Sequence, residues 1–167
     1  MPRRDDLESI MVLGSGPIKI GQAAEFDFSG SQAVRALRED GYKVILVNSN
    51  PATIQNDPEM ADVVYIEPLL PDTIAKILEK ERPCALLAGM GGQTALNIAS
   101  ELSHNGTLER LNVELIGSDL DAIDKAEDRE LFNQVCESIN LPISQAVACN
   151  SIDEVIAAAE LIGSWPI

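Results

Sequence analysis

Residues 9–16 have the sequence SIMVLGSG, a short apolar run that ends in glycine. Such a run is typical of a strand buried on both faces of a parallel sheet. Four more apolar runs follow, at residues 44–47, 63–66, 85–88 and 113–116. Apolar residues with helical spacing occupy residues 29–40, 71–81 and 93–104. This alternation predicts an α/β fold, Rossmann-like, with a doubly wound, mainly parallel sheet.

The pattern changes after residue 118. Residues 119–140 predict a short turn followed by one helix. Ser151 and Glu154 have the spacing of a capping box that opens another helix, which we expect to end near Gly163. The sequence therefore predicts a first domain over residues 1–118 and a second segment over residues 119–167.

Composition excludes several classes of function. The chain carries 12 Lys and Arg against 27 Asp and Glu, a formal net charge of −15. This acidic balance argues against binding to nucleic acid or to an anionic membrane surface, because both need concentrated basic side chains. No apolar run approaches the length of a membrane span, so we expect a cytoplasmic protein. Three scattered cysteines predict buried thiols in a reducing compartment, without a disulfide framework or zinc site.

The glycine loop after the first run departs from two known nucleotide motifs. The dinucleotide fingerprint requires G-x-G-x-x-G, but after Gly14 and Gly16 the third glycine, Gly21, falls two residues late. The next strand ends at Asn48, where that fingerprint needs a carboxylate for the ribose. The Gly-Lys-Ser/Thr of a phosphate-binding P-loop is absent from the sequence. We therefore expect a turn that connects a central strand to its helix, without NAD.

Longer motifs resemble one family. They are GSGPIKIGQAAEFDFSG at residues 14–30, VNSNPAT at 47–53, DPEMAD at 57–62, MGGQTALN at 90–97 and AIDKAEDR at 122–129. Together they resemble the opening of the carbamoyl-phosphate synthase large subunit. The resemblance implies a Rossmann-like pre-ATP-grasp domain of the first half of that subunit, followed by the first elements of an ATP-grasp domain.

The resemblance also implies a reaction. In that family the first half phosphorylates bicarbonate with ATP to carboxyphosphate, which reacts with ammonia to carbamate. The second half phosphorylates carbamate, and the product supplies arginine and pyrimidine biosynthesis. The implied partners are a glutaminase small subunit, which releases the ammonia, and the rest of the large subunit. The ATP is used with Mg²⁺ or Mn²⁺, but the metal ligands and most ATP contacts of the family lie beyond Ile167. We therefore expect no catalytic residue, metal site or activity in this segment alone.

Arg129 matches the family's nucleotide-binding arginine. A guanidinium can hold phosphate oxygens through paired hydrogen bonds and stays charged. The alternative is a solvated helix arginine that pairs with Glu127 or Asp128, an interaction of little energetic weight at a surface.

Ile18, Ile20, Ala23 and Glu25 match positions where the family's interior passage for unstable intermediates runs. A passage of this kind needs small or apolar walls that keep water away. The alternatives are core packing for the two isoleucines and, for Glu25, a carboxylate that favours the positive end of the next helix.

Residues 91–94 and 48–51 favour structural roles. The first group predicts a tight turn before a helix, and the asparagines of the second predict local hydrogen bonds within a turn. Two other classes of protein stay open. One is a biotin-carboxylase-like ATP-grasp fragment, which lacks the MGGQT run, and the other is a stand-alone binding or scaffold domain.

Overall fold

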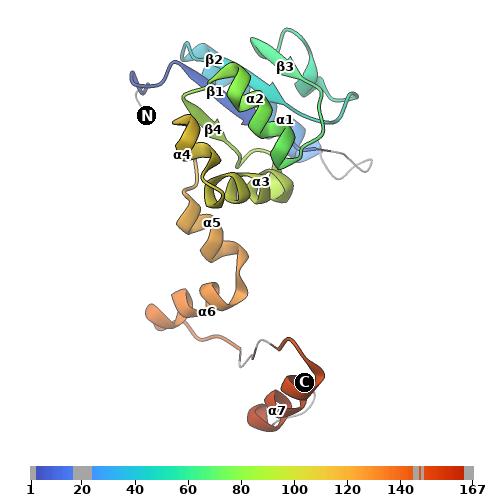
Figure 1. The fold of residues 1–167 in the computed structure, drawn as a ribbon, viewed down its shortest axis with the longest axis vertical. Helices are drawn as coiled ribbons and strands as arrows, with labels where there is room; N and C mark the ends of the chain where they lie inside the picture. The colour runs from blue at the N-terminus through green and yellow to red at the C-terminus, as the bar shows by residue number, and fades with distance from the viewer. Residues whose placement is uncertain (1–2, 17–23, 145–146, 148, 164–167) are drawn as a thin grey trace. The chain divides into compact units, whose positions relative to one another are not determined.

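The computed structural model describes residues 3–16, 24–144, 147 and 149–163. In this part of the chain five strands pair in parallel in the order β3-β2-β1-β4-β5 (Figure 1). Their bounds are β1 Ser9–Leu13, β2 Lys43–Val47, β3 Val63–Tyr65, β4 Ala85–Leu87 and β5 Glu114–Ile116. The predicted doubly wound, parallel α/β architecture is confirmed.

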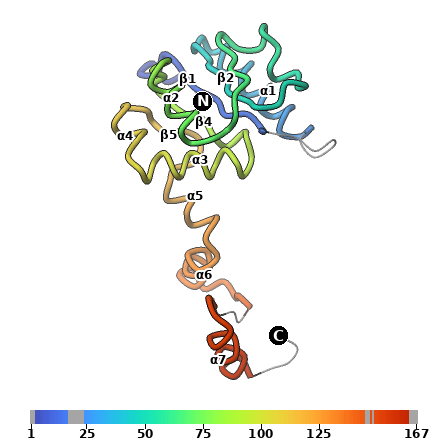
Figure 2. The backbone as a smooth tube through the Cα atoms, turned by 45° about the vertical axis from the view of Figure 1, so that its right-hand side comes forward, coloured from blue at the N-terminus to red at the C-terminus, as the bar shows by residue number. Residues whose placement is uncertain are grey.

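Alternate residues of each strand enter two separate cores, because successive side chains of a strand point to opposite faces. Met11 and Leu13 pack with apolar residues of three helices, and Ile10 and Val12 pack on the other face with a fourth. The three helices are α2 Pro71–Glu81, α3 Gly92–His104 and α4 Thr107–Leu111, and the fourth is α1 Ala24–Glu39, all of which can be followed in Figure 2. A 3₁₀ turn, η1 Ile54–Asn56, follows β2.

The predicted ends of α2 and of α1 have clear physical causes. α2 spans the predicted residues 71–81, with Pro71 in its first turn. After α1, Gly41 adopts a φ of 85° and its N–H donates to the Arg38 carbonyl at 2.9 Å, while Tyr42 N–H donates to the Leu37 carbonyl at 3.0 Å. These two bonds form a Schellman motif, which confirms Gly41 as the end of that helix.

Two predicted helices need correction. α1 was expected from residue 29 but includes residues from Ala24 onward, and its first turn contains Glu25 and Asp27, whose carboxylates interact favourably with the helix dipole. Residues 119–140 form two helices rather than one, α5 Leu120–Glu127 and α6 Arg129–Ser138. The break lies at Asp128, which is extended and whose carboxylate accepts hydrogen bonds from two backbone N–H groups of α6.

The chain divides into two compact units, Met1–Ile123 and Asp124–Ile167. The second contains α6 and α7 Ile152–Ile162, which is capped by Ser151 and Gly163 as predicted. No helix of the described residues is both long and apolar enough to cross a membrane. All three cysteines are free thiols, but Cys136 is buried whereas Cys84 and Cys149 are half-buried. The expectation of three buried thiols was therefore wrong, because two of them lie in loops.

Candidate functional site

The loops after β1, β2 and β4 converge at the carboxyl edge of the sheet. The order of the strands reverses at β1, whose neighbours β2 and β4 continue the sheet in opposite directions. In open α/β sheets the ligand crevice lies at this reversal, outside the carboxyl ends of the strands. The candidate site is therefore built from residues 14–16, 48–50 and 88–92, together with the first turns of α1.

Backbone packs directly on backbone between the first and last of these loops. A Cβ at Gly91 would overlap the Gly14 carbonyl oxygen and lie 2.7 Å from the Leu13 carbonyl oxygen. The next residue, Gly92, has a φ of 67°, and a Cβ there would lie 3.3 Å from Cζ of Phe26. Gly91 therefore leaves no room for a side chain, and the positive φ of Gly92 favours glycine. The tight turn expected at residues 91–94 lies slightly earlier, since Gly91 N–H donates to the Ala88 carbonyl at 3.0 Å and α3 begins at Gly92.

A buried pair of amides lies beneath the glycine loop. Asn48 and Gln55 are both fully buried, and Asn48 Nδ2 donates to Gln55 Oε1 at 2.8 Å. Asn48 Oδ1 accepts the N–H of Gly16 at 3.1 Å and that of Asn50 at 3.4 Å. Asn48 is therefore committed to the loops around it. The predicted local hydrogen bonds of the asparagine turn are confirmed.

The first turn of α1 is tied to the same loop. Ser15 Oγ donates to Asp27 Oδ1 at 2.9 Å. Glu25 and Asp27 both lie in the first turn of the helix, where carboxylates interact favourably with the helix dipole. Glu25 is exposed and faces solvent, so its carboxylate is available for a second role.

The proposed passage residues divide into two groups. Ile18, Ile20 and Ala23 lie outside the described residues. Glu25 is described, and the residues on either side of the gap, Gly16 and Ala24, belong to the loop and helix that the contacts above hold together.

Arg129 lies in the second unit, at the first residue of α6, and its side chain is exposed. Asp128, one of the two carboxylates considered as its partner, instead accepts the N–H groups of Glu130 and Leu131 at 2.8 and 2.9 Å. A cation in the first turn opposes the helix dipole. The helix dipole therefore does not favour an arginine at this position.

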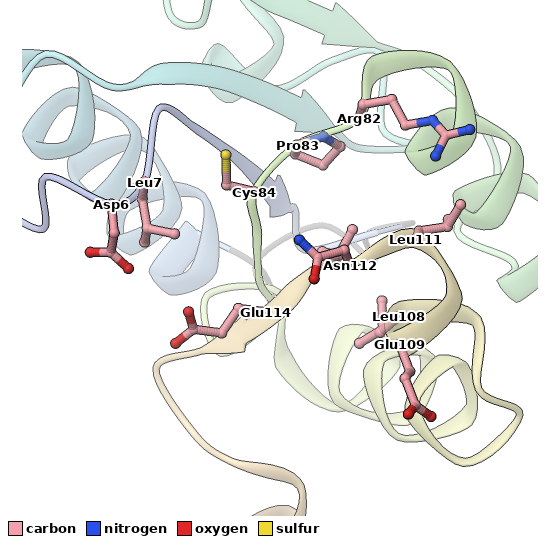
Figure 3. Close-up of a pocket in the computed structure, with 11 residues that line it drawn as sticks. Asp6, Leu7, Arg82, Pro83, Cys84, Leu108, Glu109, Leu111, Asn112 and Glu114 are labelled. Carbon is pink, nitrogen blue, oxygen red and sulfur yellow. The ribbon is translucent and has the colours of Figure 1, made fainter.

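A pocket of about 490 Å³ lies at the opposite, amino edge of the sheet (Figure 3). Its acidic lining residues Asp6 and Glu114 already share Arg4, which donates to both Glu114 carboxylate oxygens at 2.6 and 2.8 Å. This guanidinium holds the pKa of each carboxyl below its usual value. None of the predicted site residues lines this pocket, so we do not assign it a function.

Gln55 is the residue of the carboxyl edge that the sequence did not reveal. It lies in η1, between two predicted strands, in a segment without helical or strand periodicity. Two glycines, Gly14 and Gly30, are the sequence signal that could have pointed to it, because each leaves space that the side chain of another residue can fill. Nothing in the sequence says that the same side chain fills both places.

Comparison with protein families gives a match over most of the chain. A family model described as the carbamoyl phosphate synthase preATP-grasp domain matches residues 6–125. The chain is 60% identical over 163 residues to the carbamoyl phosphate synthase large chain of Neisseria meningitidis serogroup A, and 58% identical over 167 residues to that of a Nostoc species. The two alignments include 98% and 100% of this chain, but the chain spans only about 15% of the length of each relative.

A shorter relative and the solved structures complete the comparison. The large chain, N-terminal section, of Aquifex aeolicus is 58% identical, and the match covers 29% of it. The biotin carboxylase domain of Hydrogenobacter thermophilus 2-oxoglutarate carboxylase, solved with MgADP, ADP and bicarbonate, has a TM-score of 0.65 at 17% identity. That alignment covers 95% of this chain and 33% of the neighbour. At such low identity the likeness concerns the fold alone.

Proposed function

The chain belongs to the carbamoyl phosphate synthase large-chain family, as its N-terminal part, and on this premise we propose that it serves the half of the enzyme that phosphorylates bicarbonate. The observation that carries this proposal is the 60% identity over 98% of the chain. We assign residues 1–118 to the pre-ATP-grasp domain and residues 119–167 to the start of the ATP-grasp domain. The scaffold and biotin-carboxylase alternatives are not favoured.

In the proposed reaction a bicarbonate oxygen attacks the γ-phosphorus of ATP, ADP leaves, and carboxyphosphate forms. Ammonia, released from glutamine by the small subunit, attacks the carbonyl carbon; phosphate then leaves and carbamate remains. A second ATP phosphorylates carbamate to carbamoyl phosphate in the other half of the large chain. We place the enzyme in the cytoplasm, in arginine and pyrimidine biosynthesis.

Arg129 is the residue of this chain that we assign to ATP. Phosphoryl transfer is accelerated mainly by positioning and by fixed positive charge on the phosphate oxygens. An exposed guanidinium in a first helical turn fits this role. Among the described residues no three His, Cys, Asp or Glu side chains gather as a metal site requires. From the resemblance to the family, we assign the ligands of Mg²⁺ or Mn²⁺ to other parts of the enzyme and derive no step through the metal.

Ile18, Ile20, Ala23 and Glu25 are the residues that we assign to the passage for carbamate. Carbamate reacts with water to give ammonia and bicarbonate, so its transfer needs a protected path. Glu25 supports the assignment because it lies at the carboxyl edge of the sheet, at the end of α1 nearest the strand reversal.

Calorimetry tests the assignment of ATP. We expect MgATP to bind a chain extended through a complete ATP-grasp domain, and residues 1–167 alone to bind it far more weakly. Arg129→Ala should weaken binding by the extended chain, because one charge on the phosphates is lost. Arg35→Ala, which removes an exposed arginine of α1, is the matched control and should bind as the unmodified chain does. Equal binding by residues 1–167 would contradict the shared site.

A further inference from the structure

Gln55 is packed between two glycines that come from different elements. A Cβ at Gly14 would overlap Oε1 of Gln55, and a Cβ at Gly30 would overlap its Nε2. Gly14 follows β1, and Gly30 lies in the second turn of α1. The planar amide of Gln55 therefore occupies the space between the loop and the helix, and it is fully buried there.

The amide also reaches the third segment of the carboxyl edge. Gln55 Oε1 accepts a hydrogen bond from Asn48, whose own oxygen holds the N–H of Gly16. One side chain of η1 thus contacts, directly or through Asn48, the loop after β1, the loop after β2 and α1. Along the sequence, residues 14–16 directly precede residues 17–23, and the first turns of α1 directly follow them.

Space filling alone does not account for an amide at this place. Gln55 Nε2 is buried and has no hydrogen-bond partner among the described residues. An unpaired buried donor lowers stability. An apolar side chain of similar length would remove this donor, but it would also leave Asn48 Nδ2 without the acceptor that it has in Gln55 Oε1. What the amide adds is a fixed orientation, because its oxygen orders Asn48 and through it the glycine loop.

We propose that Gln55 is a positioning residue for the passage of carbamate: it sets the loop after β1 relative to the first turn of α1, which carries Glu25. This inference rests on the proposed function. Its consequence is that loss of the amide lets carbamate reach water, where it returns to ammonia and bicarbonate. ATP is then consumed without carbamoyl phosphate being formed.

The test uses the complete enzyme, large chain with glutaminase subunit, and measures ATP hydrolysed per carbamoyl phosphate formed. Gln55→Met keeps the length of the side chain and removes the amide. Gly30→Ala keeps the amide and displaces it. We expect both variants to raise the ratio severalfold. Ser31→Ala, a buried neighbour of Gly30 on α1, is the control and should leave the ratio unchanged.

The possible outcomes distinguish a failure of the role proposed for Gln55 from a failure of the proposed function. A purely structural role would lower the amount of folded enzyme, or both rates together, and would leave the ratio as it is. The inference is overturned when either folded variant keeps the ratio of the unmodified enzyme. If the unmodified enzyme forms no carbamoyl phosphate from bicarbonate, glutamine and ATP, the proposed function itself fails.

Discussion

At the scale of the residue, Glu81 is a half-buried carboxylate with two partners from different strands. Tyr65 Oη donates to its Oε1 at 2.7 Å, and Lys43 Nζ lies 3.4 Å from its Oε2. The hydrogen bond from Tyr65, followed by Lys43, holds the pKa of this carboxyl below its ordinary value of 4.5. A carboxyl with a lowered pKa stabilises the fold above its ordinary pKa, and this stabilisation is lost as the pH falls toward the folded value.

We therefore expect Glu81→Gln to lower the free energy of unfolding at neutral pH by about 1 kcal/mol, the size of a typical net hydrogen-bond contribution, because the glutamine amide still accepts a hydrogen bond but carries no charge. The difference between the variant and the unmodified chain should begin to shrink below about pH 4.5, and it should disappear once the pH has passed the lowered pKa of the folded state, where the carboxyl is protonated. Urea unfolding between pH 3 and pH 7 measures both effects. Glu67→Gln, at an exposed position, is the control. If the two free energies of unfolding differ by the same amount at every pH, the charged carboxylate of Glu81 is not the source of the stabilisation.

Cys84 carries a second expectation at this scale. Backbone hydrogen bonds at Glu8 and Ser9 lower the pKa of its thiol, and the thiolate is the form that reacts with alkylating reagents. We expect iodoacetamide to modify Cys84 of the native chain before Cys136, which is buried. Peptide mapping by mass spectrometry gives the order, and equal labelling after unfolding serves as the control. Faster labelling of Cys136 would show that the fold opens there first.

At the scale of the element, α1 depends on a contact that its own sequence does not contain. Glycine inside a helix is about 1 kcal/mol less favourable than alanine, so Gly30→Ala would stabilise an isolated helix. In this fold the new methyl group meets Gln55. Tertiary packing and helix propensity therefore oppose one another at this position.

A double-mutant cycle separates the two effects. We expect Gly30→Ala alone to destabilise the chain by about 1–3 kcal/mol, as overpacking does. In a Gln55→Ala background the overlap is relieved, and the same substitution should become neutral or stabilising. Urea unfolding of the four proteins measures the coupling. Additive effects would mean that the helix accommodates the methyl group without touching Gln55.

At the scale of the whole molecule, nearly all of the buried apolar residues belong to the first unit. The two cores contain residues from Leu7 to Val113, and in the second unit the structure describes Cys136 and Ala158 as the buried apolar positions. That unit instead exposes large apolar side chains, among them Phe132, Ile152 and Leu161. Its stability is therefore expected to depend on contacts that it does not make within itself.

Truncation tests this expectation. A chain of residues 1–125 should unfold cooperatively on heating, with a midpoint close to that of the full 167 residues, because both cores are retained. A peptide of residues 124–167 should show little helical circular dichroism on its own. Cooperative unfolding of the peptide, or loss of the transition in the shortened chain, would contradict the division.

The five parallel strands, the ends of α2 and the family could be predicted from the amino-acid sequence alone, because apolar periodicity, caps and long ordered motifs are local properties of the chain. It also named Arg129 and the four passage residues, whose roles stay predictions. The fold alone did not select the family, since biotin carboxylase domains share it at 17% identity.

The surroundings of Gln55, by contrast, are visible only in the tertiary structure. Two glycines and one amide, 41 positions apart from Gly14 to Gln55, become neighbours through the pairing of β1 with β2. Such a contact depends on how strands pair and helices pack, and no local pattern encodes it.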